Sequence, residues 1–103
     1  MNRPFSFKLR GKTWVCYLVQ PDHAGLKMGD EYTMGMTHLK TNLIYVASDM
    51  SRETILAVLW HEVTHAILEP IDDALAEENV CNLMGDAMLE LLPQTKRWPK
   101  WAK

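Results

Sequence analysis

Two histidines separated by three residues dominate the chemistry that this chain can offer. The stretch His61-Glu62-Val63-Thr64-His65 has the pattern His-Glu-x-x-His and lies inside an apolar run from Ser51 to Leu68. On an α-helix, residues four positions apart lie one above the other, so His61 and His65 can direct two imidazoles at one point. Glu62 lies about 100° around the helix from His61, near enough to act on a molecule bound there. Two neutral imidazoles beside a carboxylate suit a zinc ion that holds an activated water.

The residues around this motif predict a buried helix. Apolar side chains cover most of its circumference: Ile55, Leu56, Val58, Leu59, Trp60, Val63, Ala66 and Ile67. A helix that is apolar on nearly all sides is expected in the interior of a domain. Polar groups there need partners, because an unpaired polar group in a core is costly. A metal ion would be such a partner for His61 and His65; the alternative is a pair of core histidines bonded to backbone carbonyls.

The residues after the motif restrict the choice of a third metal ligand. A catalytic zinc site usually has three protein ligands and one open position. A histidine six residues after His65, preceded by a suitably placed glycine, would be the metzincin pattern, but Ile71 and Leu68 occupy those positions. The motif helix is expected to end near Leu68 or Glu69, because Pro70 disfavours helical geometry in the residue before it. The next helix is therefore expected to supply the third ligand.

Glu77 and Glu78 are the acidic residues at the start of that next helix. Glu77 precedes Val80, on the inward-facing apolar line, by three residues, so the two side chains share a face. Glu78 lies about 100° away from that face. We expect Glu77 to be the third ligand and Glu78 to lie behind it or in solvent. The alternative is that both only complement the positive N-terminal end of the helix.

With His61, His65 and Glu77 on the metal, the fourth position is open to water. Zinc lowers the pKa of that water towards neutrality and polarises a peptide carbonyl. Glu62 would take the proton of the water and later pass it to the leaving amine. This residue set therefore favours hydrolysis of a peptide bond.

The sequence leaves two parts of such a site open. A further donor should stabilise the developing oxyanion, and Tyr32, His38 and Tyr45 are candidates among which no spacing rule selects. The strand Leu43–Ala47, if it lies at the sheet edge beside the cleft, could bind a substrate peptide as an added strand.

The remaining pattern predicts a single α+β domain over residues 1–103, with a core at 5–92 and a basic, aromatic tail at 93–103. About four strands in an antiparallel or mixed sheet are expected to pack on the motif helix and on a second, C-terminal helix. Expected strands are Phe5–Leu9, Thr13–Val19, Tyr32–His38 and Leu43–Ala47, paired as two hairpins, with a loop at 20–30 that exposes His23. Asp49 or Ser51 can cap the motif helix, and the second helix is expected from Asp72 or Asp73 to about Leu92.

Composition excludes several classes of protein. The chain has 103 residues, 48% of them hydrophobic, and a net charge of −2. No apolar run approaches the roughly 20 residues of a membrane helix, and the N-terminus lacks the apolar core of a secretion signal. We therefore expect a cytoplasmic protein. Basic residues gather in residues 1–12 and after Pro93, whereas the acids lie between them; this acidic centre favours a bound cation and argues against nucleic acid at the site.

Four residues outside the motif carry separate expectations. Cys16 and Cys81 lack the spacing of a zinc knuckle or a redox pair, so both are expected to be buried free thiols. Trp98 and Trp101 lie among basic residues of the tail. Ten residues are too few for a nucleic-acid track, so the tail is expected to pack its tryptophans back on the domain.

A family resemblance involves several of the same residues. The matching features are Gly35 with Thr37, Ile44-Tyr45-Val46, Arg52-Glu53-Thr54, Leu59, the block His61–Ile67, and Glu77-Glu78-x-Val80. Over residues 32–92 they resemble the ImmA/IrrE family, small zinc metallopeptidases of bacteria, phages and mobile elements. The resemblance implies a zincin-like fold, zinc held by His61, His65 and a downstream glutamate, and cleavage of a regulatory protein. The chain departs from the family in lacking a recognisable DNA-binding or sensor segment. Its spacing from His65 to Glu77 is also tighter than in many relatives, which leaves the choice between Glu77 and Glu78 open.

Three functional hypotheses follow. The first is a zinc endopeptidase that acts on an intracellular protein. The second is a non-catalytic adaptor module of phage or mobile-element origin, stabilised by zinc. The third is a helical interaction domain without metal. Glu62 separates the first two, because a purely structural site has no use for a base beside an open position.

Overall fold

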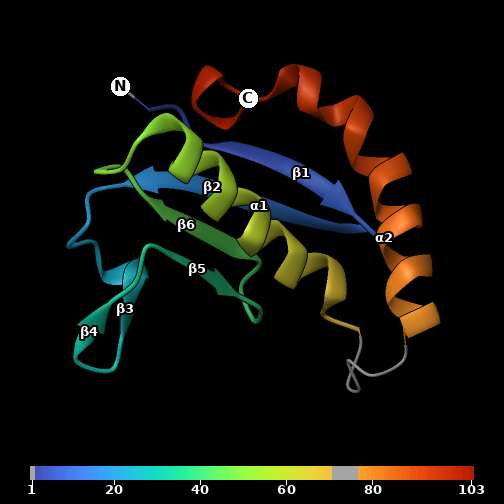
Figure 1. Ribbon diagram of the computed structural model, residues 1–103, viewed down its shortest axis with the longest axis horizontal. Helices are drawn as coiled ribbons and strands as arrows, with labels where there is room; N and C mark the ends of the chain where they lie inside the picture. Colours follow the sequence, from blue (N-terminus) through green and yellow to red (C-terminus); the bar gives the residue numbers. More distant parts are fainter. Residues whose placement is uncertain (1, 71–76) are drawn as a thin grey trace.

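A computed structural model describes residues 2–70 and 77–103 of the chain, and of residues 77–79 it describes the backbone alone (Figure 1). A four-stranded sheet forms one layer, and helix α1 (Arg52–Leu68) crosses one face of it. Its strands are β1 (Phe5–Leu9), β2 (Lys12–Val19), β5 (Gly35–His38) and β6 (Leu43–Ala47). Helix α2 (Glu77–Leu91) lies beside β1 and α1. The predicted α+β class, the mixed four-stranded sheet and the two helices are confirmed.

The strand order is β1-β2-β6-β5. Strands β1 and β2 form one antiparallel hairpin and β5 and β6 the other, as predicted, while β2 and β6 pair in parallel at the centre. The condition under which Leu43–Ala47 could bind a substrate strand is therefore not met, because β6 has a neighbour on each side. The edge strand next to α1 is β5. The predicted loop at 20–30 contains a 3-10 turn, η1 (Ala24–Leu26), and strand β3 (Lys27–Met28), which pairs with β4 (Glu31–Tyr32) in a small hairpin. The strand predicted from Tyr32 to His38 is therefore shorter and begins at Gly35, because Tyr32 pairs with β3 instead.

The two edges of the sheet differ in how their backbone groups are satisfied. On β1, the Lys8 N–H donates to Gln94 Oε1 at 2.8 Å, and Gln94 Nε2 donates to the Lys8 carbonyl at 2.8 Å. The Arg10 N–H donates to Glu90 Oε1 at 3.0 Å. Side chains from α2 and from η2 (Leu92–Arg97) thus cover the β1 edge, as a sheet edge generally requires.

On the β5 edge, two residues direct their backbone groups away from the sheet. The Ala47 N–H donates to the Met34 carbonyl at 2.9 Å, which fixes the phase of the antiparallel β5–β6 ladder. Because bonded pairs alternate with non-bonded pairs, Met36 points its N–H and C=O at β6, whereas Gly35 and Thr37 point theirs away from it. The Gly35 carbonyl accepts one bond from Thr33 Oγ1 at 2.9 Å.

Helix α1 has the predicted bounds, and side chains satisfy both of its ends. Ser51 is the N-cap, and its hydroxyl accepts from the Thr54 N–H at 3.3 Å. At the other end the Arg10 guanidinium donates to the carbonyls of Ala66 and Ile67 at 3.0 and 2.9 Å. The Ala66 carbonyl also accepts from the Glu69 N–H at 3.4 Å. Because the last carbonyls of a helix lack the regular partner four residues later, Arg10 acts as a C-terminal cap.

Burial of α1 is confined to one face, which corrects the prediction of a buried helix. The buried positions are Ile55, Leu59, Glu62, Val63, Ala66 and Ile67. Trp60 is half-buried against Trp98 of the C-terminal segment, with ring centroids 5.5 Å apart. His61 and His65 are exposed. Apolar residues on one side of α1 pack on the sheet, and those on another side pack on the C-terminal segment. The strip of helix surface between these two contacts is exposed to solvent.

The C-terminal segment packs back on the sheet, as predicted. Trp98 is 3% exposed, and its ring centroid lies 4.6 Å from that of Phe5. Trp101, in η3 (Lys100–Ala102), donates from Nε1 to the Arg3 carbonyl at 2.7 Å. The predicted start of the second helix at Asp72 or Asp73 lies outside the described residues. Within the described part of the chain, no helix has both the length and the apolar character that crossing a membrane requires.

The two cysteines differ in exposure, which gives a first testable expectation. Cys16 is fully buried on β2, and this burial raises the pKa of its thiol. Cys81 is exposed on α2, contrary to the prediction, because it lies off the apolar line of that helix. We expect a thiol reagent such as DTNB to modify one cysteine in the native protein and two in denaturant. Native Cys81→Ser should not react, and fast modification of two native thiols would contradict this arrangement.

Candidate metal centre

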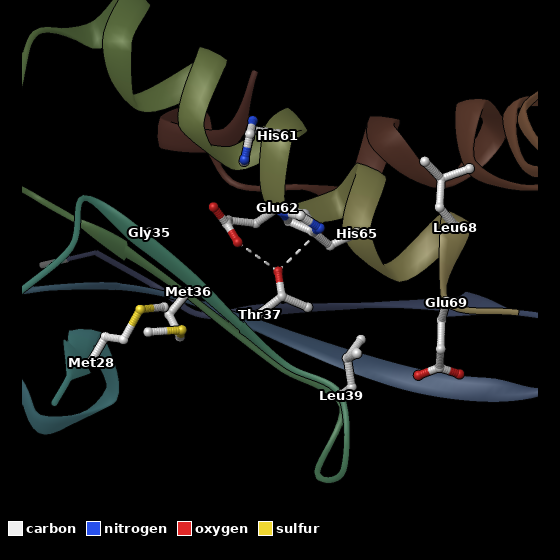
Figure 2. Close-up of a pocket in the computed structure, with 10 residues that line it drawn as sticks. All are labelled: Met28, Gly35, Met36, Thr37, Leu39, His61, Glu62, His65, Leu68 and Glu69. Atoms are coloured by element: carbon white, nitrogen blue, oxygen red, sulfur yellow. Dashed lines mark hydrogen bonds between the residues drawn. The ribbon is translucent and has the colours of Figure 1, made fainter. Parts of the chain in front are cut away.

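Three potential metal ligands lie together on one side of α1. Each of them offers one ligand atom, and the three atoms, from His61, Glu62 and His65, lie within 4.8 Å of one another. The two imidazole rings have centroids 4.9 Å apart and stand nearly perpendicular. Figure 2 shows all three side chains on the groove side of the helix. The i, i+4 spacing of the histidines thus produces the predicted convergence.

The environment of the carboxylate differs from that of the imidazoles. Glu62 is 7% exposed, and among the described residues no other charged side chain is buried. Both histidines, in contrast, are exposed to solvent. The Thr37 hydroxyl lies 2.8 Å from Glu62 Oε1 and 3.0 Å from the Glu62 carbonyl oxygen. The carboxylate is therefore held from the sheet, whereas no hydrogen bond joins either imidazole to another described residue.

Gly35 allows β5 to approach the helix closely enough for this contact. A Cβ at this position would lie 2.5 Å from Val58 Cγ1 and 3.1 Å from both Cγ and Oε2 of Glu62. Real Cβ atoms do not make a contact of 2.5 Å, so a larger residue would push the strand away from α1. The absence of a side chain here brings Thr37 within hydrogen-bond distance of Glu62.

Two hollows meet at His61 and Glu62, and His65 lines the first of them. One has a volume of about 500 Å³, and its apolar walls come from Met28, Met36, Leu39 and Leu68. The other has a volume of about 490 Å³ and lies towards the start of α1, with walls from Thr33, Met34, Thr54, Ala57 and Val58. Both include Gly35, His61 and Glu62. A groove therefore runs between the β5 edge and α1, with the candidate metal ligands near its middle.

The donor set fits a zinc ion. Zinc binds imidazole nitrogens at about 2.0–2.1 Å, so two nitrogens on a tetrahedral ion are roughly 3.3 Å apart. The ligand atoms of His61, Glu62 and His65 lie within 4.8 Å of one another, which is compatible with that spacing. Both imidazoles are solvent-accessible and belong to the borderline nitrogen ligands that zinc prefers.

Not every predicted site residue can be placed at the groove. The backbone of Glu77 begins α2, but its side chain, like that of Glu78, lies outside the described residues. Another acid, Glu69, lines the groove one turn after His65, but it pairs with Lys12 at 2.6 Å. Among the described residues the ligand group consists of His61, Glu62 and His65. The choice of Glu77 as third ligand stays a prediction.

The three oxyanion candidates do not line the groove. Tyr45 and His38 lie on the sheet face opposite α1, where their rings make an edge contact with centroids 5.4 Å apart. His38 Nε2 lies 2.9 Å from the Gly25 carbonyl oxygen, so its imidazole contacts η1 rather than the groove. Tyr32 is half exposed, at 51%, on the small hairpin. His23 is exposed, as predicted, and caps η1 through Nδ1.

Sequence reasoning did not find the roles of Gly35 and Thr37, although both belong to the family resemblance. Alternation along a strand shows that the two share a face, but not that this face meets Glu62. No family model, no curated protein and no solved structure matches this chain. The case for a metal site rests on the donor set and its surroundings.

Removing a ligand should weaken zinc binding strongly. We expect His61→Ala and His65→Ala each to lower zinc affinity by more than about 100-fold, beyond the usual effect of a residue that only orients a ligand. Glu77→Ala should also weaken binding if it supplies the third ligand. Competition with a chromophoric chelator measures each affinity. Glu69→Gln and His23→Ala are matched controls that should bind as wild type, and wild-type affinity in His61→Ala would exclude the site.

Adding one methyl group at Gly35 should disturb the contact between β5 and α1. We expect Gly35→Ala to lower the free energy of unfolding by about 1–3 kcal/mol, the usual range for overpacking. Gly85→Ala on α2 is the control, because nothing lies within 4 Å of its added Cβ and alanine favours a helix. Urea unfolding measures both variants. Equal stability of Gly35→Ala and wild type would contradict the close approach.

Proposed function

We propose that this chain is a zinc-dependent metallopeptidase that hydrolyses a peptide bond in a protein substrate. The observation that carries the proposal is the group of two exposed imidazoles and one buried carboxylate, set in a groove beside a free strand edge. A structural zinc site is normally enclosed by four protein ligands. His61 and His65 instead face an open groove, which leaves room for water and substrate.

The residues have separate roles in this proposal. His61, His65 and a downstream glutamate, for which Glu77 is the candidate, hold the ion. A zinc ion bound there would supply Lewis acidity, which lowers the pKa of a coordinated water and polarises a peptide carbonyl. Glu62 accepts the proton of the attacking water and returns it to the leaving amine as the C–N bond breaks. The resemblance to ImmA/IrrE metallopeptidases suggests the same assignment of roles.

The β5 edge supports a peptide as the substrate. Gly35 and Thr37 direct backbone groups away from β6, so an extended segment can pair with them as a further strand. Such a segment would lie along the groove and pass the candidate metal ligands. The walls formed by Met28, Met34 and Met36 favour apolar side chains on it, and flexible methionines adapt to different shapes. A substrate segment would therefore be extended and largely apolar.

A zinc-stabilised binding module is the second candidate. It is favoured by the exposed apolar side chains around the groove, among them Met28 at 61%, Met34 at 60% and Leu39 at 48%. Exposed apolar residues that gather on one surface commonly mark a binding site. Both candidates bind a segment in the same groove, and they differ in whether Glu62 performs chemistry there.

One substitution distinguishes the two candidates. We expect Glu62→Gln to keep zinc within about threefold of wild-type affinity and to lower peptide cleavage by at least about 100-fold, because an amide cannot act as the base. The measurement is mass spectrometry of a proteome-derived peptide library incubated with zinc-loaded protein. Glu69→Gln is the matched control and should cleave normally. Equal cleavage by Glu62→Gln and wild type would exclude the mechanism, and peptides bound but uncut by wild type would favour the binding module.

A further inference from the structure

The contact between Thr37 and Glu62 connects the strand edge to the carboxylate. Thr37 Oγ1 lies 2.8 Å from Glu62 Oε1 and 3.0 Å from the Glu62 carbonyl oxygen (Figure 2). A threonine hydroxyl has one proton, so it can donate fully to one of these two acceptors. If the carbonyl oxygen receives the proton, Thr37 only links β5 to α1. If Oε1 receives it, Thr37 also orients the side chain of Glu62.

Two features favour the carboxylate as acceptor. Within α1 the Glu62 carbonyl accepts the N–H four residues later, so it already has a partner. An ionised carboxylate is the stronger acceptor, and its bonds from hydroxyl groups are shorter than neutral ones. The shorter of the two distances is the one to Oε1. Because Glu62 is buried, a hydrogen bond donated to Oε1 also replaces a hydrogen bond to water that the carboxylate loses on burial.

We propose that Thr37 is the positioning residue of Glu62, which deepens the proposed function and in its catalytic part rests on it. The hydroxyl of Thr37 fixes Oε1 from the sheet side. Oε2 then lies towards Gly35, where the absence of a Cβ leaves space beside it. During the reaction Oε2 accepts the proton of water and returns it to the amine, while Thr37 keeps its own proton and donates to Oε1 throughout.

The position of Thr37 on β5 gives this bond a second consequence. The backbone N–H and C=O of Thr37 point to the open edge, while its side chain points to Glu62. A peptide that pairs with this edge is thereby held in register by the same residue that holds the base. A single residue, Thr37, then sets the alignment between the scissile bond of the peptide and Glu62.

The hydrogen bond can be tested in the metal-free protein, independently of any activity. Thr37→Val removes the hydroxyl and keeps the shape, whereas Thr37→Ser keeps the hydroxyl. We expect Thr37→Val to lower the urea midpoint of the wild-type chain and to lower it clearly less in a Glu62→Ala background, because the carboxylate acceptor is then absent. Thr37→Ser should stay nearer to wild type. An equal loss in both backgrounds would mean that the bond goes to the Glu62 carbonyl, and would overturn the proposal.

The positioning role is tested with the zinc-loaded protein and the best-cleaved peptide of the library. We expect Thr37→Val to lower kcat at least about tenfold, the usual effect of losing a hydrogen bond to a charged group. KM and the zinc dissociation constant should stay within about twofold of wild type, and Thr37→Ser should restore most of kcat. Wild-type kcat in Thr37→Val, or parallel losses in kcat, KM and zinc affinity, would overturn the role.

Failure of the proposed function has a different signature. If wild type binds zinc but cleaves no peptide, the peptidase proposal fails. The double-mutant comparison in metal-free protein then still decides whether Thr37 holds the Glu62 carboxylate. If the comparison shows no coupling while wild type cleaves peptides, the peptidase proposal stands and the positioning role of Thr37 fails.

Discussion

The close approach of strand β5 to helix α1 is the constraint on which the candidate site depends. It exists because Gly35 has no side chain where Val58 and Glu62 occupy the space. The approach brings the Thr37 hydroxyl to the Glu62 carboxylate and leaves both histidines facing the groove. A wider separation would release the carboxylate into solvent, where it would lose its fixed direction. The missing side chain at Gly35 therefore determines both the position of the Glu62 carboxylate and the shape of the groove beside it.

The covered strand edge and the candidate metal site lie at opposite edges of the sheet. At the β1 side, side chains of α2 and η2 satisfy the strand edge, and aromatic rings of Phe5, Trp60 and Trp98 pack together. At the β5 side the edge stays open, and the exposed apolar residues of the small hairpin surround it. An open strand edge is a liability in most proteins. Its position beside the candidate ligands supports the proposal that it binds an extended peptide.

The elements could be predicted from sequence because their signals are local. Alternation marked Phe5–Leu9, and Ser51 and Pro70 marked the limits of α1. The order of the strands could not be predicted in this way. The parallel pairing of β2 with β6 joins two segments that lie far apart in the chain and that no single turn connects. The exposure of His61 and His65 depends on what packs against each side of α1, so burial was overestimated. Likewise, the role of Thr37 depends on a contact across 25 positions, which no local pattern encodes.

The central claim is that His61 and His65 hold a zinc ion that remains open to solvent in the groove. X-ray absorption at the zinc edge of the loaded protein tests it most directly. The account predicts two imidazole ligands and oxygen ligands at about 2.0–2.2 Å around a four-coordinate ion. Spectra without imidazole scattering, or with sulfur at about 2.3 Å, would contradict it.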